Sequence, residues 1–125
     1  MKISINDIET LVFYQSDGST SSAVKIVYRP TAKEYVCDDY PSQVQNRRKA
    51  LYSLISDFTS DFKVITNPKY VLFDPIRVIK PNSEKKGLIR ELIWHFKNCE
   101  WNYYIDSDGK KVSKRYVESD LELNF

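Results

Sequence analysis

Hydrophobic and polar residues alternate along the first forty positions in the way that half-buried strands require. The predicted strands cover residues 7–15, 22–29 and 33–38. In the second of them Val24, Ile26 and Tyr28 alternate with Lys25, Val27 and Arg29. Asp17-Gly18, inside the polar stretch 16–21, is a strong signal for a tight hairpin turn. The pattern therefore predicts three consecutive strands joined by short turns.

A helix is predicted to begin directly after this meander. Ser42 is followed three residues later by Gln45, which is the spacing of a capping box. Apolar side chains then recur at helical spacing, at Val44, Leu51, Leu54, Ile55 and Phe58. This arrangement leaves Gln45, Arg48 and Lys49 on the solvent side.

The second half of the chain has shorter and less regular patterns. Apolar runs at residues 62–65, 70–73 and 76–79 are separated by Asn-Pro and Asp-Pro pairs, so they are predicted to be strands or extended segments. A second helix is predicted to start at Ser83 and to carry Leu88, Ile89, Leu92, Ile93 and Phe96. Gly87 weakens this prediction. The segments 101–105 and 111–117, separated by a turn at 106–109, predict a closing hairpin.

The element order predicts the α+β class, and the length of 125 residues predicts a single domain over 1–125. The hydrophobic fraction of 42% and the aromatic fraction of 14% argue for an ordered globule and against disorder. No apolar run approaches the ~18 residues of a membrane span, and the first residues do not resemble a signal peptide. We therefore expect a cytoplasmic protein without a membrane partner.

Little in the sequence indicates a metal, a cofactor or an enzyme. Cys37 and Cys99 lack metal-ligand spacing, and His95 is the only histidine. The acidic pairs Asp38-Asp39 and Asp106/Asp108 lie in turns, where aspartate is favoured for conformational reasons. No cofactor, no metal and no catalytic residue are predicted.

Two segments carry a resemblance to a known family. Residues 22–31, Ser-Ala-Val-Lys-Ile-Val-Tyr-Arg-Pro-Thr, resemble the stretch Ser-Ala-Val-Arg-Ile-x-His-x-Pro-Thr-Gly of class I peptide chain release factors. Residues 42–51, Ser-Gln-Val-Gln-Asn-Arg-Arg-Lys-Ala-Leu, are similar to the helix Ser-Gln-x-x-Asn-Arg-x-x-Ala-Leu of the hydrolase domain of that family. The resemblance covers about residues 5–58 and implies a release-factor-like β-β-β-α core. Residues 59–125 form an extension of unknown affinity.

The loop that performs the chemistry of the family is missing. Release factors hydrolyse the peptidyl-tRNA ester with a Gly-Gly-Gln loop, whose glutamine N–H helps to stabilise the oxyanion. One alignment places Phe13-Tyr14-Gln15 on this motif, and the other loses the motif and closes a tight turn with Asp17-Gly18. The second keeps the strand spacing. The resemblance therefore implies a non-catalytic relative, with any role of Gln15 left open, and a virus-encoded source would suit such a small protein.

The resemblance also directs attention to the basic residues. The net charge of +2 does not decide between partners, but Arg47, Arg48 and Lys49 form a run on the predicted helix. Lys25 and Arg29, with Lys33, add charge on the adjoining strands. These are the groups we expect to contact phosphates of structured RNA, of a ribosome or of tRNA.

Two other functions remain open. A protein-interaction or inhibitor module would use residues 59–125, where Trp94, Trp101, Tyr103 and Tyr104 are either interface aromatics or core packing. A small DNA-binding regulator is the third hypothesis, because residues 112–116 are similar to the closing strand of LytTR-type regulators. The oligomeric state is not predicted.

Overall fold

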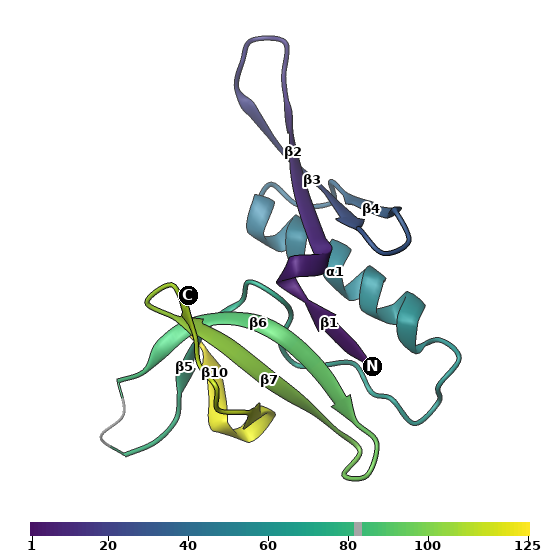
Figure 1. The fold of residues 1–125 in the computed structure, drawn as a ribbon. Coiled ribbons are helices and arrows are strands. Elements are labelled where there is room, and N and C mark those ends of the chain that lie inside the picture. Colours follow the sequence, from purple (N-terminus) through teal and green to yellow (C-terminus); the bar gives the residue numbers. More distant parts are fainter. Residues whose placement is uncertain (82–83) are drawn as a thin grey trace. The chain divides into compact units, whose positions relative to one another are not determined.

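A computed structural model describes residues 1–81 and 84–125, and within them the chain forms two compact units. The helical unit comprises Asn6–Asp61, and the sheet unit combines Met1–Ile5 with Phe62–Phe125. Across the described residues the elements are ten strands, one α-helix and two short 3₁₀ helices, which confirms the predicted α+β class (Figure 1). The single domain over residues 1–125 stays a prediction.

The helical unit begins within the short 3₁₀ helix η1 (Ile5–Asp7) and continues with the three predicted strands, which form an antiparallel sheet of order β2-β3-β4. The strands are β2 (Ile8–Tyr14), β3 (Thr20–Tyr28) and β4 (Lys33–Cys37). The predicted tight turn is also present. Gln15 N–H donates to the Ser19 carbonyl at 2.7 Å, and Gly18 adopts a φ of 87°, a left-handed value that favours glycine.

The predicted helix is present as α1 (Gln43–Thr59), and it lies against β3 and β4 (Figure 1). The Ser42 Oγ accepts a hydrogen bond from Gln45 N–H at 3.3 Å, so this half of the predicted capping box is confirmed. Leu51, Leu54 and Ile55 are buried as predicted. Val44 is 40% exposed, because the polar Asn46 takes the buried position in the first turns.

The sheet unit is one antiparallel sheet of order β10-β5-β6-β7-β8. Its strands are β1 (Lys2–Ser4), β5 (Pro75–Val78), β6 (Lys86–His95), β7 (Glu100–Ser107), β8 (Lys110–Lys111), β9 (Tyr116–Val117) and β10 (Leu121–Leu123). β1 pairs with β6, and β9 pairs with β7. Only η2 (Glu118–Asp120) separates β9 from β10, although β10 lies at the far end of the strand order. The sheet must therefore curve strongly around its aromatic core.

The second predicted helix is wrong, because residues 86–95 form strand β6. The predicted start at Ser83 lies outside the described residues. A bulge between Ile89 and Glu91 inserts Arg90, so that Ile89 faces Ile105 while Leu92 faces Tyr103. The bulge thereby places the buried residues Ile89 and Leu92, which are three positions apart in the sequence, on one face of the strand. Buried residues with this spacing are also expected on one face of a helix.

The remaining predictions for the second half are confirmed only in part. The run at residues 76–79 overlaps β5 (Pro75–Val78), whereas residues 62–65 and 70–73 form turns and coil instead of strands. The closing hairpin exists as β7 and β8, but the predicted strand at 111–117 is divided between β8 and β9. No helix in the described residues has both the length and the apolar character needed to cross a membrane.

Candidate nucleic-acid interface

Asn46 fixes the beginning of α1 against the sheet. Its Nδ2 donates to the carbonyls of Ser22 at 2.7 Å and Tyr40 at 2.9 Å, while its Oδ1 accepts from Tyr40 N–H at 2.9 Å. The Cys37 thiol donates to the same Oδ1 at 3.3 Å. Gln43 adds a hydrogen bond to the Ser21 carbonyl at 2.8 Å. Two residues that carry the family resemblance thus have a structural task, which is to position the basic run that follows them.

The basic run borders a shallow hollow on the helical unit, which we call the tyrosine hollow. It has a volume of about 370 Å³ and is lined by Tyr40, Gln45, Arg48, Lys49 and Tyr52. The Arg48 Cζ lies 5.9 Å from the centroid of the Tyr52 ring, and the Lys49 Nζ lies 5.7 Å from that of Tyr40. Tyr40 is 41% exposed. Two cations and two aromatic rings therefore meet at one accessible place.

Lys49 also has an acidic neighbour. Its ammonium group forms an ion pair with the Asp39 carboxylate, and the hydrogen bond to Asp39 raises the pKa of Lys49. Both side chains are about half exposed, so solvent screens this pair strongly. An anionic ligand in the tyrosine hollow would have to compete with Asp39.

The other predicted phosphate contacts do not join the tyrosine hollow. Lys25 lies between Val24 and Ile26, which are buried on the α1 side, so it points to the opposite face of the sheet and pairs there with Glu34 at 3.4 Å. Arg29 follows the end of β3, and its Nη1 donates to the Asn6 carbonyl at 3.0 Å. Arg47 is half-buried, with its Nε shielded from solvent. The structure thus brings Arg48 and Lys49 together and places the other three elsewhere.

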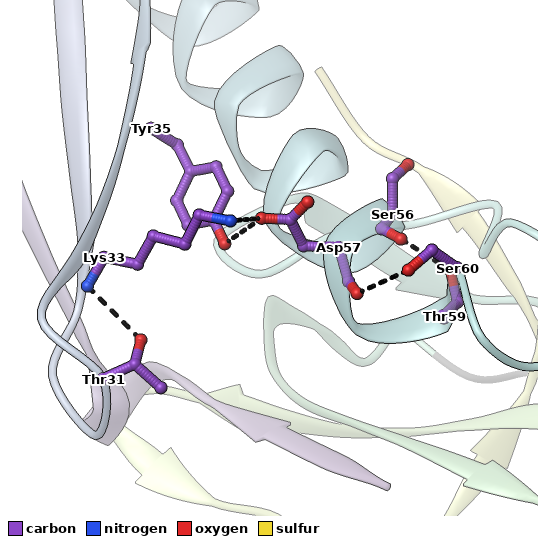
Figure 2. Close-up of polar contacts among 7 residues, drawn as sticks. All are labelled: Thr31, Lys33, Tyr35, Ser56, Asp57, Thr59 and Ser60. Carbon is purple, nitrogen blue, oxygen red and sulfur yellow. Dashed lines mark hydrogen bonds and ion pairs between the residues drawn. The ribbon is translucent and has the colours of Figure 1, made fainter.

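A second polar cluster joins β4 to the last turns of α1 (Figure 2). The Asp57 Oδ2 accepts hydrogen bonds from the Lys33 Nζ at 2.5 Å and from the Tyr35 hydroxyl at 2.7 Å. Burial is the main cause that raises the pKa of Tyr35, and the hydrogen bond to Asp57 adds to it. The hydrogen bond from Lys33 is the main cause that lowers the pKa of Asp57. Lys33 therefore helps to join β4 to the last turns of α1, a role that the sequence does not indicate.

Replacing Asp57 by asparagine is expected to lower the thermal midpoint at neutral pH and to have no effect in strong acid. The pKa of Asp57 is depressed in the folded state, so its contribution is present above the unfolded value and disappears as the pH falls through the folded pKa. Circular dichroism melting curves from neutral pH down to about pH 2 would test this. Asp61→Asn, at an exposed acid after the same helix, is the control. A midpoint difference that is independent of pH would contradict the assignment.

The aromatic segment predicted as a possible protein interface belongs to the core of the sheet unit. Trp94, Trp101 and Tyr103 are 3%, 2% and 0% exposed. The two indole rings pack edge to face at 5.4 Å, and the Trp101 Nε1 donates to the Thr66 carbonyl at 2.7 Å. Of the four aromatics only Tyr104 is half-exposed. A protein partner through residues 59–125 stays a prediction.

The described part of the chain contains no candidate metal site. Within residues 1–81 and 84–125, no three side chains from His, Cys, Asp or Glu are grouped so that they could hold a metal ion. Both cysteines are free thiols; Cys37 is buried and Cys99 is exposed.

A family model matches the second half of the chain. A family of unknown function, DUF6960, matches residues 58–122, from the last turn of α1 to β10. No curated protein and no solved structure matches the chain. The match lies almost entirely in the sheet unit, and the resemblance of residues 5–58 to release factors stays a prediction.

Proposed function

Because the chain belongs to the family of unknown function DUF6960, its activity has to be argued from its own residues, and we propose that the protein binds RNA without hydrolysing an ester. The RNA would be single-stranded or locally unpaired, as in loops of tRNA or of a ribosomal particle. The observation that carries the proposal is the tyrosine hollow, where Arg48 and Lys49 border two tyrosine rings.

The chemistry of the tyrosine hollow suits an unpaired nucleotide. Bases that are splayed out of a helix stack on tyrosine rings, and every base offers a π-face for this contact. Tyr40 is exposed enough to serve as such a platform. Arg48 and Lys49 would meet the flanking phosphates, since guanidinium and ammonium groups form charge-assisted hydrogen bonds with phosphate oxygens.

The hairpin between β2 and β3 supports binding without catalysis. The release-factor resemblance implies that a glutamine N–H would have to face the reacting ester. Gln15 donates its N–H to the Ser19 carbonyl at 2.7 Å, and Gly18 N–H donates back to the Gln15 carbonyl at 3.0 Å. The Gln15 N–H is therefore already used in a hydrogen bond of the turn.

Local charge, and not the charge of the whole unit, has to attract the RNA. The helical unit carries six basic and eight acidic side chains, so its net charge is unfavourable for a polyanion. We therefore expect weak, strongly salt-dependent binding that depends on few contacts. Replacing Asp39 by asparagine should strengthen it, because the competing carboxylate would be removed.

Arg48→Ala is expected to weaken binding to a labelled single-stranded RNA about tenfold at low salt and to reduce the salt slope by about one unit. Tyr40→Ala should weaken binding to a similar extent, about tenfold, but leave the salt slope unchanged, because stacking releases no counterions. Fluorescence anisotropy at a series of salt concentrations measures both quantities.

The matched control is Lys25→Ala, which removes a positive charge from the opposite face of the sheet. It should leave the affinity nearly unchanged. An equal loss of affinity for Lys25→Ala and Arg48→Ala would show that binding is nonspecific. Absence of binding at the lowest salt would overturn the proposal.

A further inference from the structure

A buried acid lies on the face of the sheet unit that is opposite to the hydrophobic core. On β6 Glu91 is followed by Leu92, which is fully buried in the core and faces Tyr103. Neighbouring side chains of a strand point to opposite faces, so Glu91 lies on the other face, in one row with Ser4 of β1 and Tyr104 of β7. The Glu91 side chain is nevertheless only 6% exposed. Glutamate is rarely buried to this extent unless it has a partner.

Two lysines from other strands are the partners of this acid. The Lys2 Nζ lies 3.8 Å and the Lys111 Nζ lies 3.6 Å from the Glu91 Oε1. Both distances are longer than a hydrogen bond, and both ion pairs end on the same oxygen. A carboxylate can accept several hydrogen bonds through its two oxygens. Glu91 therefore keeps acceptor capacity that the lysines do not use.

These three charged groups border a hollow of the sheet unit, which we call the glutamate hollow. It has a volume of about 450 Å³ and is lined by Lys2, Glu91, Ile93, Tyr104, Lys111 and Ser113. The side chains of Lys2 and Lys111 are 58% and 47% exposed, so the ammonium groups lie nearer to solvent than the carboxylate. The Lys111 Nζ lies 5.3 Å from the centroid of the Tyr104 ring. The hollow thus combines a deep acceptor, an aromatic ring and two outer cations, at a size that suits a small molecule.

These groups match the parts of a guanine nucleotide. Guanine has two adjacent donors, N1–H and N2–H, on its Watson–Crick edge, and they can meet both oxygens of one carboxylate. Adenine, cytosine and uracil each present one donor there, next to an acceptor. An unpaired base also stacks on a tyrosine ring, and a phosphate forms charge-assisted hydrogen bonds with lysine. A free amino acid would satisfy the charges of the hollow but would leave the tyrosine ring unused.

We propose that the glutamate hollow binds a guanine nucleotide, either free or as an unpaired guanosine of RNA. Glu91 accepts the two donors of the base, and Tyr104 stacks on its ring. Lys2 and Lys111 turn from Glu91 to the phosphate, which their exposed, weakly held ion pairs permit. All of these residues belong to the sheet unit, so the site is separate from the tyrosine hollow. It goes beyond the proposed function, since stacking alone does not distinguish one base from another.

The first test compares three nucleotides on the unaltered full chain by isothermal titration calorimetry. Guanosine monophosphate should bind most tightly. Inosine monophosphate, which lacks the N2 amino group, should bind about tenfold more weakly, and adenosine monophosphate, which also lacks the N1–H, more weakly still. Equal affinities for the three nucleotides, absence of binding, or displacement of guanosine monophosphate by an equal concentration of free glutamate would overturn the proposal.

Glu91→Gln tests the acceptor. Glutamine keeps the size of the side chain but turns an amide donor towards the donors of guanine, so the affinity for guanosine monophosphate should fall at least about tenfold. The preference over inosine monophosphate should disappear as well. Glu122→Gln is the matched control, because Glu122 is an acid of the same unit that is 42% exposed and paired with Arg77. Equal losses in the two variants would contradict the assignment.

Lys111→Gln tests the phosphate contact at a more exposed position, where the substitution does not endanger folding. It should weaken binding of guanosine monophosphate about tenfold and leave binding of guanosine, which has no phosphate, unchanged. An unaltered affinity for guanosine monophosphate, or an equal loss for both ligands, would overturn the placement of the nucleotide in the glutamate hollow.

The source of the guanine is decided with two labelled single-stranded RNAs, an oligouridine and the same chain with one guanosine. Tighter binding of the RNA with guanosine, lost in Glu91→Gln, would assign the glutamate hollow to RNA. Equal binding of both RNAs together with binding of guanosine monophosphate would assign it to a free nucleotide. The two hollows fail independently: Arg48→Ala should leave binding of guanosine monophosphate intact, and Glu91→Gln should leave binding of the oligouridine intact.

Discussion

Gly87→Ala is expected to destabilise the sheet unit by about 3 kcal/mol or more, which is at the upper end of single substitutions. A Cβ atom at Gly87 would lie 2.1 Å from the backbone oxygen of Asp106 and 3.0 Å from its carbonyl carbon. Backbone atoms of β7 cannot rotate away as a side chain does, so β6 and β7 would have to separate. Denaturant unfolding followed by tryptophan fluorescence measures the effect, because both tryptophans lie in the sheet unit.

The matched control is Gly109→Ala. Gly109 has a φ of 74° and nothing within 4 Å of the position of its Cβ atom. Alanine there suffers the strain of a left-handed conformation without a collision, at a cost of about 1 kcal/mol. If Gly87→Ala costs no more than Gly109→Ala, the close approach of the two strands is not as tight as described.

Asn46→Ala is expected to destabilise the helical unit by about 3 kcal/mol. The substitution removes the hydrogen bonds of Asn46 and leaves the Ser22 carbonyl and both backbone groups of Tyr40 without their partner in a partly buried place. Far-UV circular dichroism follows this unit, because α1 is the only α-helix in residues 1–81 and 84–125. The transition of the helix signal should move to lower denaturant concentration while the tryptophan transition moves little.

Gln43→Ala provides the comparison for this experiment. It removes one hydrogen bond, to the Ser21 carbonyl, and should cost about 1 kcal/mol. Equal effects of the two substitutions would contradict the assignment of several stabilising hydrogen bonds to Asn46.

The parts of the fold that could be predicted are those determined by near neighbours in the sequence. The Asp17-Gly18 turn depends on one left-handed glycine, and the start of α1 depends on the hydroxyl of Ser42. The pattern of strand β6 predicts a helix because its bulge shifts the alternation of buried residues by one position. Only the pairing with β5, β1 and β7 decides that this segment is extended, and that information lies far away in the chain.

The residues of the candidate site divide in the same way, into those that sequence neighbours predict and those that only the fold brings together. The sequence predicts Arg48 and Lys49 because they are adjacent in a basic run. It does not predict Tyr40 and Tyr52, because one precedes the helix and the other lies a turn further along. Only the folded backbone places these two rings beside the cations.

The discontinuity of the sheet unit determines the order in which a growing chain can become structured. Residues 6–61 can fold as soon as they have been synthesised, whereas β1 must wait for its partner residues at Glu91–Ile93. A fragment that starts at Phe62 would contain most of the family match but would leave the edge of β6 uncovered where β1 belongs. Expression of the C-terminal half alone should therefore give aggregated material, and supplying residues 1–5 as a fused first strand should restore solubility.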